Sequence, residues 1–241
     1  MSHTLHRRGS VESLKDDIVF LMLPAHRYND VDIPKEEIGR RLRRFMEIGL
    51  EKGCIYIGNA STGNQDTHNG IEGVLDSTVE NATVHCVFDD EEKAIEMMKA
   101  LKEADLGMSV VVSGLFDMLG ECCKKSGLEP HTVEYSLGIW GNTSLLPDEP
   151  ILEINTMCGH GMVSVGRIED VIKRINAGRM TCEEGGKELG KTCTCGIFNW
   201  KRAGEILQRI TGTLQHGESP LRRCLQVSAM TTTVETLRQT I

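Results

Sequence analysis

The chain has 241 residues, of which 39% are hydrophobic, so it is long enough to bury a substantial core in one large domain or two smaller ones. Its formal net charge is -8, and aromatic residues make up only 4% of it. These values argue against nucleic acid as the main partner, because phosphate binding needs a basic surface and single strands need stacking rings.

The N-terminal segment lacks the apolar core of a secretory signal, and no stretch approaches the length of a membrane span. The sequence therefore predicts a cytoplasmic protein without a membrane partner. The nine cysteines are expected to be reduced thiols, because their number is odd and the chain is long enough to fold without disulfides. Thiols are thus available for metal binding or nucleophilic chemistry.

Apolar runs alternate with amphipathic patterns through the first half of the chain. We expect strands at 17–25, 54–57, 83–88 and 108–113. We expect helices at 33–52, from Asp89 past Leu101, and at 115–125. The polar stretch 58–77 is too long for an ordinary connection, so it is either a binding loop or a linker.

Two further strands are expected at 131–139 and 151–155, followed by helices around Ile168–Ile175, Thr181–Gly190 and Ala203–Ile210. The fold class is therefore α/β or α+β, with a mixed sheet of about six strands, flanking helices and a helical C-terminal third. A boundary near residue 80 would separate an N-terminal α/β segment, 1–80, from an α/β domain, 81–241, that carries the cysteine site. A single domain fits equally well.

The most informative residues are two short clusters of cysteine and histidine in predicted turns. Cys158 and His160 lie between an expected strand and a helix, and Cys193 and Cys195 lie just before another helix. Two helices separate the clusters and could return the second turn to the first. Glycine follows Cys158 and Cys195, which lets the backbone approach a bound group closely.

Three interpretations fit these residues. Cys158, Cys193 and Cys195 could hold a four-iron four-sulfur cluster whose open iron acts on substrate. The same cysteines with His160 could form a closed zinc site, but the one-residue spacing differs from the usual two-residue knuckle, so the cluster is favoured. Without metal, a thiolate at a helix N-terminus could act as nucleophile or base, with His160 or a second cysteine as partner.

A local resemblance bears on the third interpretation. The segment Met157-Cys158-Gly159-His160-Gly161 resembles the one that carries a catalytic cysteine in proline racemases and hydroxyproline epimerases. In that family two cysteines flank the α-carbon of the substrate and exchange its proton. The family's second motif, Asp-Arg-Ser-Pro followed by Cys-Gly-Thr-Gly, has no counterpart in this chain. The resemblance therefore implies only that this segment can present a reactive thiol.

The remaining cysteines are expected to be packing residues, although Cys122 could donate to a cluster and Cys182 could point towards it. The favoured function is a cytoplasmic enzyme of lyase or desulfurising type that acts on a small molecule. Cys158 and His160 would be catalytic. The alternatives are a cofactor-free cysteine racemase or epimerase and a metal- or cluster-carrying scaffold protein. The polar tail beyond Gln215 offers a contact for a homo-oligomer.

Overall fold

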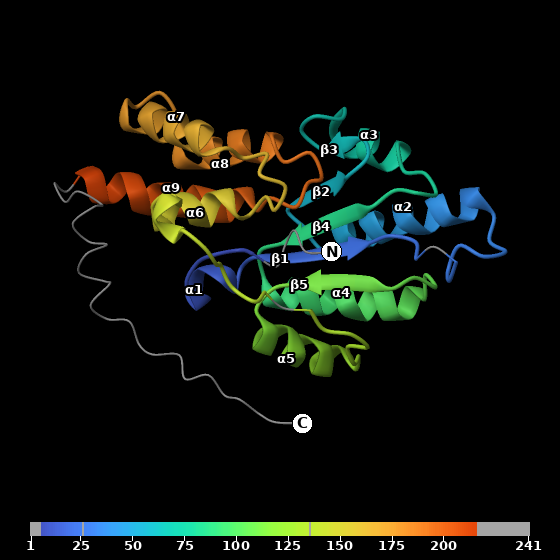
Figure 1. Ribbon diagram of the computed structural model, residues 1–241. Coiled ribbons are helices and arrows are strands. Elements are labelled where there is room, and N and C mark those ends of the chain that lie inside the picture. Colours follow the sequence, from blue (N-terminus) through green and yellow to red (C-terminus); the bar gives the residue numbers. More distant parts are fainter. Residues whose placement is uncertain (1–5, 26, 135, 216–241) are drawn as a thin grey trace, which may run out of the picture.

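The computed structural model describes residues 6–25, 27–134 and 136–215, and its centre is a five-stranded sheet (Figure 1). The strands lie in the order β3-β2-β4-β1-β5, and all neighbouring pairs are antiparallel. Their bounds are β1 Ile18–Met22, β2 Tyr56–Asn59, β3 Gly63–Asn64, β4 Val84–Phe88 and β5 Val110–Ser113.

Two β-α-β units interleave to make this sheet. Helix α2 (Lys35–Glu51) connects β1 to β2, with β4 between them, and helix α4 (Glu91–Ala104) connects β4 to β5, with β1 between them. This is the split β-α-β-β-α-β arrangement of ferredoxin-like folds. Such a topology carries no function by itself, so the function has to be argued from the side chains.

Helices α2 and α4 cover one face of the sheet and lie behind it in Figure 1. Alternate residues of β1, namely Ile18, Phe20 and Met22, point into this first core, where Leu42 and Phe45 of α2 meet them. Helix α5 (Phe116–Ser126) packs against α4. The short helix α3 (Gly70–Asp76) packs beside β2 and β3, and the short helix α1 (Val11–Leu14) precedes β1.

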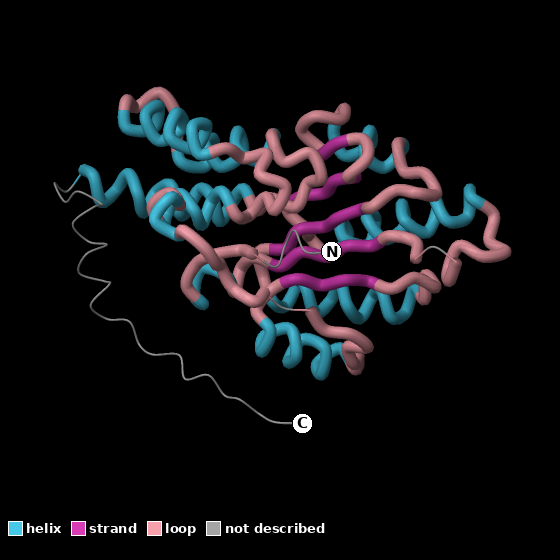
Figure 2. The backbone as a smooth tube through the Cα atoms, in the orientation of Figure 1, coloured by secondary structure: helices cyan, strands magenta, loops and turns pink. Residues whose placement is uncertain are grey.

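A second core joins the other face of the sheet to the C-terminal helices, which gather beyond one end of the strands (Figure 2). Val19, Tyr56 and Val87 contribute from the sheet. The helices are α6 Glu149–Asn155, α7 Val165–Asn176, α8 Cys182–Lys191 and α9 Trp200–Gln215. Because β1 is buried on both faces, its sequence is a continuous apolar run.

The predicted α/β character is correct, but the expected mixed sheet of about six strands is not: the described residues form five strands with antiparallel pairing. Residues 131–134 and 136–139 form no strand, and most of them are exposed. The apolar run 151–155 is helix α6, so the helical part begins at Glu149. Asp148 precedes its first turn and Pro150 lies within it, which favours a helix start over a strand.

The polar stretch 58–77 is ordered structure rather than a simple loop. It holds the end of β2, the short strand β3 and helix α3. The sheet also runs across residue 80, because β1 and β2 pair with β4, which lies beyond it.

Candidate functional site

The first cysteine turn connects α6 to α7, so it joins two helices rather than a strand and a helix as predicted. The backbone N–H of Cys158 donates to the Asn155 carbonyl at 3.3 Å, and the N–H of Gly161 donates to the Cys158 carbonyl at 3.0 Å. Gly161 has a φ of 68°, a left-handed conformation that glycine adopts without steric cost. The turn therefore places Cys158 inward and carries His160 to the surface.

The second cysteine turn connects α8 to α9 and lies directly on strand β2. The N–H of Gly196 donates to the Cys193 carbonyl at 2.9 Å, and Gly196 has a φ of 72°. A Cβ atom built on Gly58 of β2 would lie 2.4 Å from the Cys195 carbonyl oxygen. The backbone of the turn thus approaches the strand as closely as two glycines allow.

The two turns bring the four predicted site residues together. Cys193 Sγ lies 3.8 Å from Cys195 Sγ, and Cys195 Sγ lies 3.5 Å from His160 Nδ1. The Cys158 thiol is hydrogen-bonded to Cys193. Cys158, Cys193 and Cys195 are 2%, 0% and 3% exposed, and they form part of the second core. The contacts therefore form a chain from Cys158 through Cys193 and Cys195 to His160.

The three thiols in this series of contacts differ in pKa. The hydrogen bond to Cys193, followed by burial, raises the pKa of Cys158. The hydrogen bond from Cys158 lowers the pKa of Cys193, but the bond to Cys195 and burial raise it to about 12 overall. The hydrogen bond from Cys193 lowers the pKa of Cys195 despite burial. Cys195, beside His160, is thus the thiol that ionises most easily.

Backbone N–H groups also point at the sulfur atoms. Those of His160 and Met162 hydrogen-bond to Cys158, and that of Ile197 hydrogen-bonds to both Cys193 and Cys195. These bonds favour the charged sulfur in each case, because an N–H donor stabilises a thiolate. These N–H groups therefore partly offset burial, which raises the pKa of all three thiols.

Asn64 of β3 fixes the second turn from the sheet side. Its amide Nδ2 donates to the carbonyl of Cys193 at 2.9 Å and to that of Lys191 at 3.2 Å. Asn64 is fully buried, so these bonds satisfy an amide that would otherwise be costly to bury. It lies in the polar stretch 58–77, for which the sequence predicts either a binding loop or a linker.

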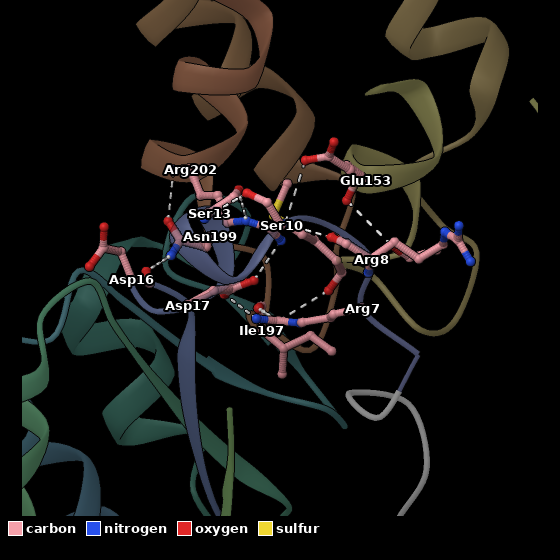
Figure 3. Close-up of polar contacts among 12 residues, drawn as sticks. Arg7, Arg8, Ser10, Ser13, Asp16, Asp17, Glu153, Ile197, Asn199 and Arg202 are labelled. Carbon is pink, nitrogen blue, oxygen red and sulfur yellow. Dashed lines mark hydrogen bonds and ion pairs between the residues drawn. The ribbon is translucent and has the colours of Figure 1, made fainter. Parts of the chain in front are cut away.

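A buried ion-pair network lies beside both turns (Figure 3). Asp17, 2% exposed, pairs with Arg7 and with Arg202, whose Nη1 lies 2.8 Å from the Asp17 carboxylate. Burial lowers the pKa of Arg202, and Asp17 opposes that shift. Glu153 of α6 pairs with Arg209 at 2.8 Å. Sequence reasoning missed this network. One available signal was Arg202, which lies four residues before the apolar Ile206 and so on the buried face of α9.

The other cysteines do not join the site. Cys54, Cys86 and Cys122 belong to the first core, on the opposite face of the sheet, which confirms their predicted packing role and leaves Cys122 away from the turns. Cys182 Sγ contacts Thr211 Oγ1 at 3.6 Å, at the far end of α8 from Cys193. Cys224 lies outside the described residues. Asn199 caps α9, since its side chain accepts from the N–H of Arg202 at 3.0 Å.

No protein-family model, curated protein or solved structure matches the chain. No helix in the described ranges is long and apolar enough to cross a membrane. The site's residues therefore have to carry the functional argument.

Proposed function

We propose that this chain is a metalloprotein that binds one tetrahedral metal ion of the zinc class through Cys158, Cys193, Cys195 and His160. The observation that carries the proposal is the pair of contacts at Cys195. With Zn–S bonds of about 2.3 Å and Zn–N bonds of about 2.0–2.1 Å, a tetrahedron has edges of about 3.8 Å between sulfurs and about 3.5 Å from sulfur to nitrogen. The sulfurs of Cys193 and Cys195 are 3.8 Å apart, and Cys195 Sγ is 3.5 Å from His160 Nδ1.

The donor set also fits this class of ion in its chemistry. Three sulfurs and an imidazole are ligands that zinc prefers, and N–H groups aimed at the sulfurs are the outer interactions that orient thiolate ligands. As the side chains stand, no group of three or more His, Cys, Asp or Glu residues in the described ranges is arranged to hold a metal ion. Two edges of the tetrahedron are already present at Cys195, and binding therefore requires the four donors to converge on one point while keeping them.

The position of the thiols favours a structural role over a catalytic one. All three are buried, and they join the helical layer to β2. A surface hollow of about 290 Å³, beside Leu23 and Pro24, lies at the end of β1 away from the cysteines, so it does not open onto the thiols. Bound metal would supply crosslinking between the two turns, and hence stability to the second core.

A four-iron four-sulfur cluster on Cys158, Cys193 and Cys195 makes a different demand. In such a cluster each thiolate binds a different iron, so the sulfurs stand farther apart than around one ion. The short contact between Cys193 and Cys195 supports the single ion instead. A lyase step at an open iron remains the alternative that metal analysis can distinguish.

Metal content and affinity test the proposal. We expect protein purified without chelator to hold one zinc per chain, and Cys193→Ser to lower zinc affinity by at least about 100-fold, because a ligand is lost. Cys123→Ser is the matched control and should bind zinc normally, because Cys123 is a half-buried cysteine on the other face of the sheet. If the protein is brown after anaerobic purification and contains iron and sulfide, the site holds the cluster and the zinc proposal is wrong. Metal-free protein that does not take up zinc would reject the site.

A second candidate function rests on the lowered pKa of Cys195 beside His160. We propose it as cofactor-free cysteine chemistry, in which the Cys195 thiolate is the nucleophile or base. Alkylation of the metal-free protein tests it, since Cys195 should react before Cys158 and Cys193. Equal or slower alkylation of Cys195 would reject this candidate.

A further inference from the structure

The segment before α1 lies against both cysteine turns, and Arg7 is its inward side chain. The Arg7 side chain is only 6% exposed. Its Nη2 donates to the carbonyl oxygen of Met157 at 3.2 Å. The same Nη2 donates to the carbonyl oxygen of Ile197 (Figure 3). One guanidinium therefore bonds to backbone from both turns, which are about forty residues apart in the chain.

These two carbonyls are next to the proposed ligands. Met157 immediately precedes Cys158, and Ile197 follows Cys195 by two residues. The N–H of Ile197 also bonds to the sulfurs of Cys193 and Cys195. A shift of Arg7 would therefore move the backbone that orients all three sulfurs.

Arg7 is itself held in place by buried partners. It pairs with Asp17, which is fixed from the other side by Arg202. Arg202 Nη2 donates to the carbonyl of Arg8 at 2.6 Å, and the N–H of Arg8 donates to Thr156 Oγ1 at 3.1 Å. The segment is therefore attached to the sheet, to α9 and to the end of α6 at once.

We propose that Arg7 is a positioning residue of the metal site, and that metal binding is coupled through it to docking of residues 6–10. The inference rests on the proposed metal site. A planar guanidinium can bond to two carbonyls and a carboxylate together, whereas a lysine ammonium offers a single point. Coupling between two binding events is reciprocal, so the metal must strengthen docking of the segment as much as the docked segment strengthens metal binding.

The test compares Arg7→Ala, Arg7→Lys and Arg8→Ala in the full chain. Arg8 is the matched control, because its side chain is partly exposed and pairs with Glu149 at the surface. Zinc affinity is measured by competition with a chelator. Arg7→Ala should lower it about 10–100-fold, the usual effect of losing an outer-shell partner, and Arg7→Lys should lower it less. Arg8→Ala removes only the partly exposed pair with Glu149, so it should lower zinc affinity much less than Arg7→Ala does.

Limited trypsin digestion gives a second readout. Cleavage at Arg7 and Arg8 of the wild-type chain should slow when zinc is added and speed up with chelator, because zinc holds the segment in place. The Cys193→Ser protein should lose this zinc dependence.

The outcomes separate the two proposals. A wild-type chain that binds no zinc rejects the metal site itself. If wild type binds zinc and Arg7→Ala binds it equally well, while unfolding earlier both with zinc and with chelator, Arg7 is merely structural and the inference is wrong. Should Arg7→Ala fail to fold, unchanged affinity in Arg7→Lys together with zinc-independent cleavage of wild type would overturn it.

Discussion

Gly58 offers a direct test of how the second cysteine turn rests on the sheet. In Gly58→Ala, the new methyl group would lie 2.4 Å from the carbonyl oxygen and 2.6 Å from the carbonyl carbon of Cys195. Both atoms belong to the backbone, so no side-chain rotation relieves the clash. Ordinary contact begins near 3.4 Å, so the turn must move by about 1 Å, and overpacking of this kind costs about 1–3 kcal/mol.

Urea unfolding at pH 7 measures that cost. Gly166→Ala in α7 is the control, because its Cβ position is open space apart from its chain neighbours and the backbone of its own helix, and alanine is the better helix former, with a gain of up to about 1 kcal/mol. Gly58→Ala should also weaken zinc binding, since Cys195 moves with the turn. If Gly58→Ala unfolds at the same urea concentration as wild type, the close contact between β2 and the turn is wrong.

Two further predictions concern charges between the layers. Arg202→Ala should lower the free energy of unfolding by up to about 3–5 kcal/mol, because it removes a buried partner of Asp17, which is then left with Arg7 alone; a loss below about 1 kcal/mol in urea unfolding would contradict the network. Burial raises the pKa of Asp89, but hydrogen bonds from Lys201 and Lys93 outweigh it and lower that pKa. Asp89→Asn should therefore cost up to about 1 kcal/mol at pH 7. Because the pKa of Asp89 is lower in the folded chain, this contribution is full above the unfolded value of about 3.9 and disappears as the pH falls further. A separation between the two unfolding curves that does not shrink as the pH falls below about 3.9 would refute this.

Much of the fold could be predicted because local signals agreed with tertiary structure. Thr181 and Glu184 form the capping box that their spacing indicates, and α8 begins there. The prediction of a strand at 151–155 is wrong because a short apolar run of this kind is compatible with a strand or a buried helix. The prediction of a strand at 131–139 is wrong because strand formation depends on a pairing partner, which local sequence does not reveal.

The site could be predicted in part for a related reason. Cys158, His160, Cys193 and Cys195 stood out because their chemistry is rare in polar turns, and the structure brings them into contact. Arg7 gave no such signal, because its role depends on carbonyls far along the chain. Any residue type can supply a backbone carbonyl, so the sequence around Met157 and Ile197 does not reveal that Arg7 binds there.

The coordination of zinc in the loaded protein tests the central claim most directly. X-ray absorption at the zinc edge reports the number and type of ligand atoms. We predict three sulfurs at about 2.3 Å and one nitrogen at about 2.0 Å, with the nitrogen replaced or lost in His160→Ala. A shell of oxygen and nitrogen atoms without sulfur would contradict the account.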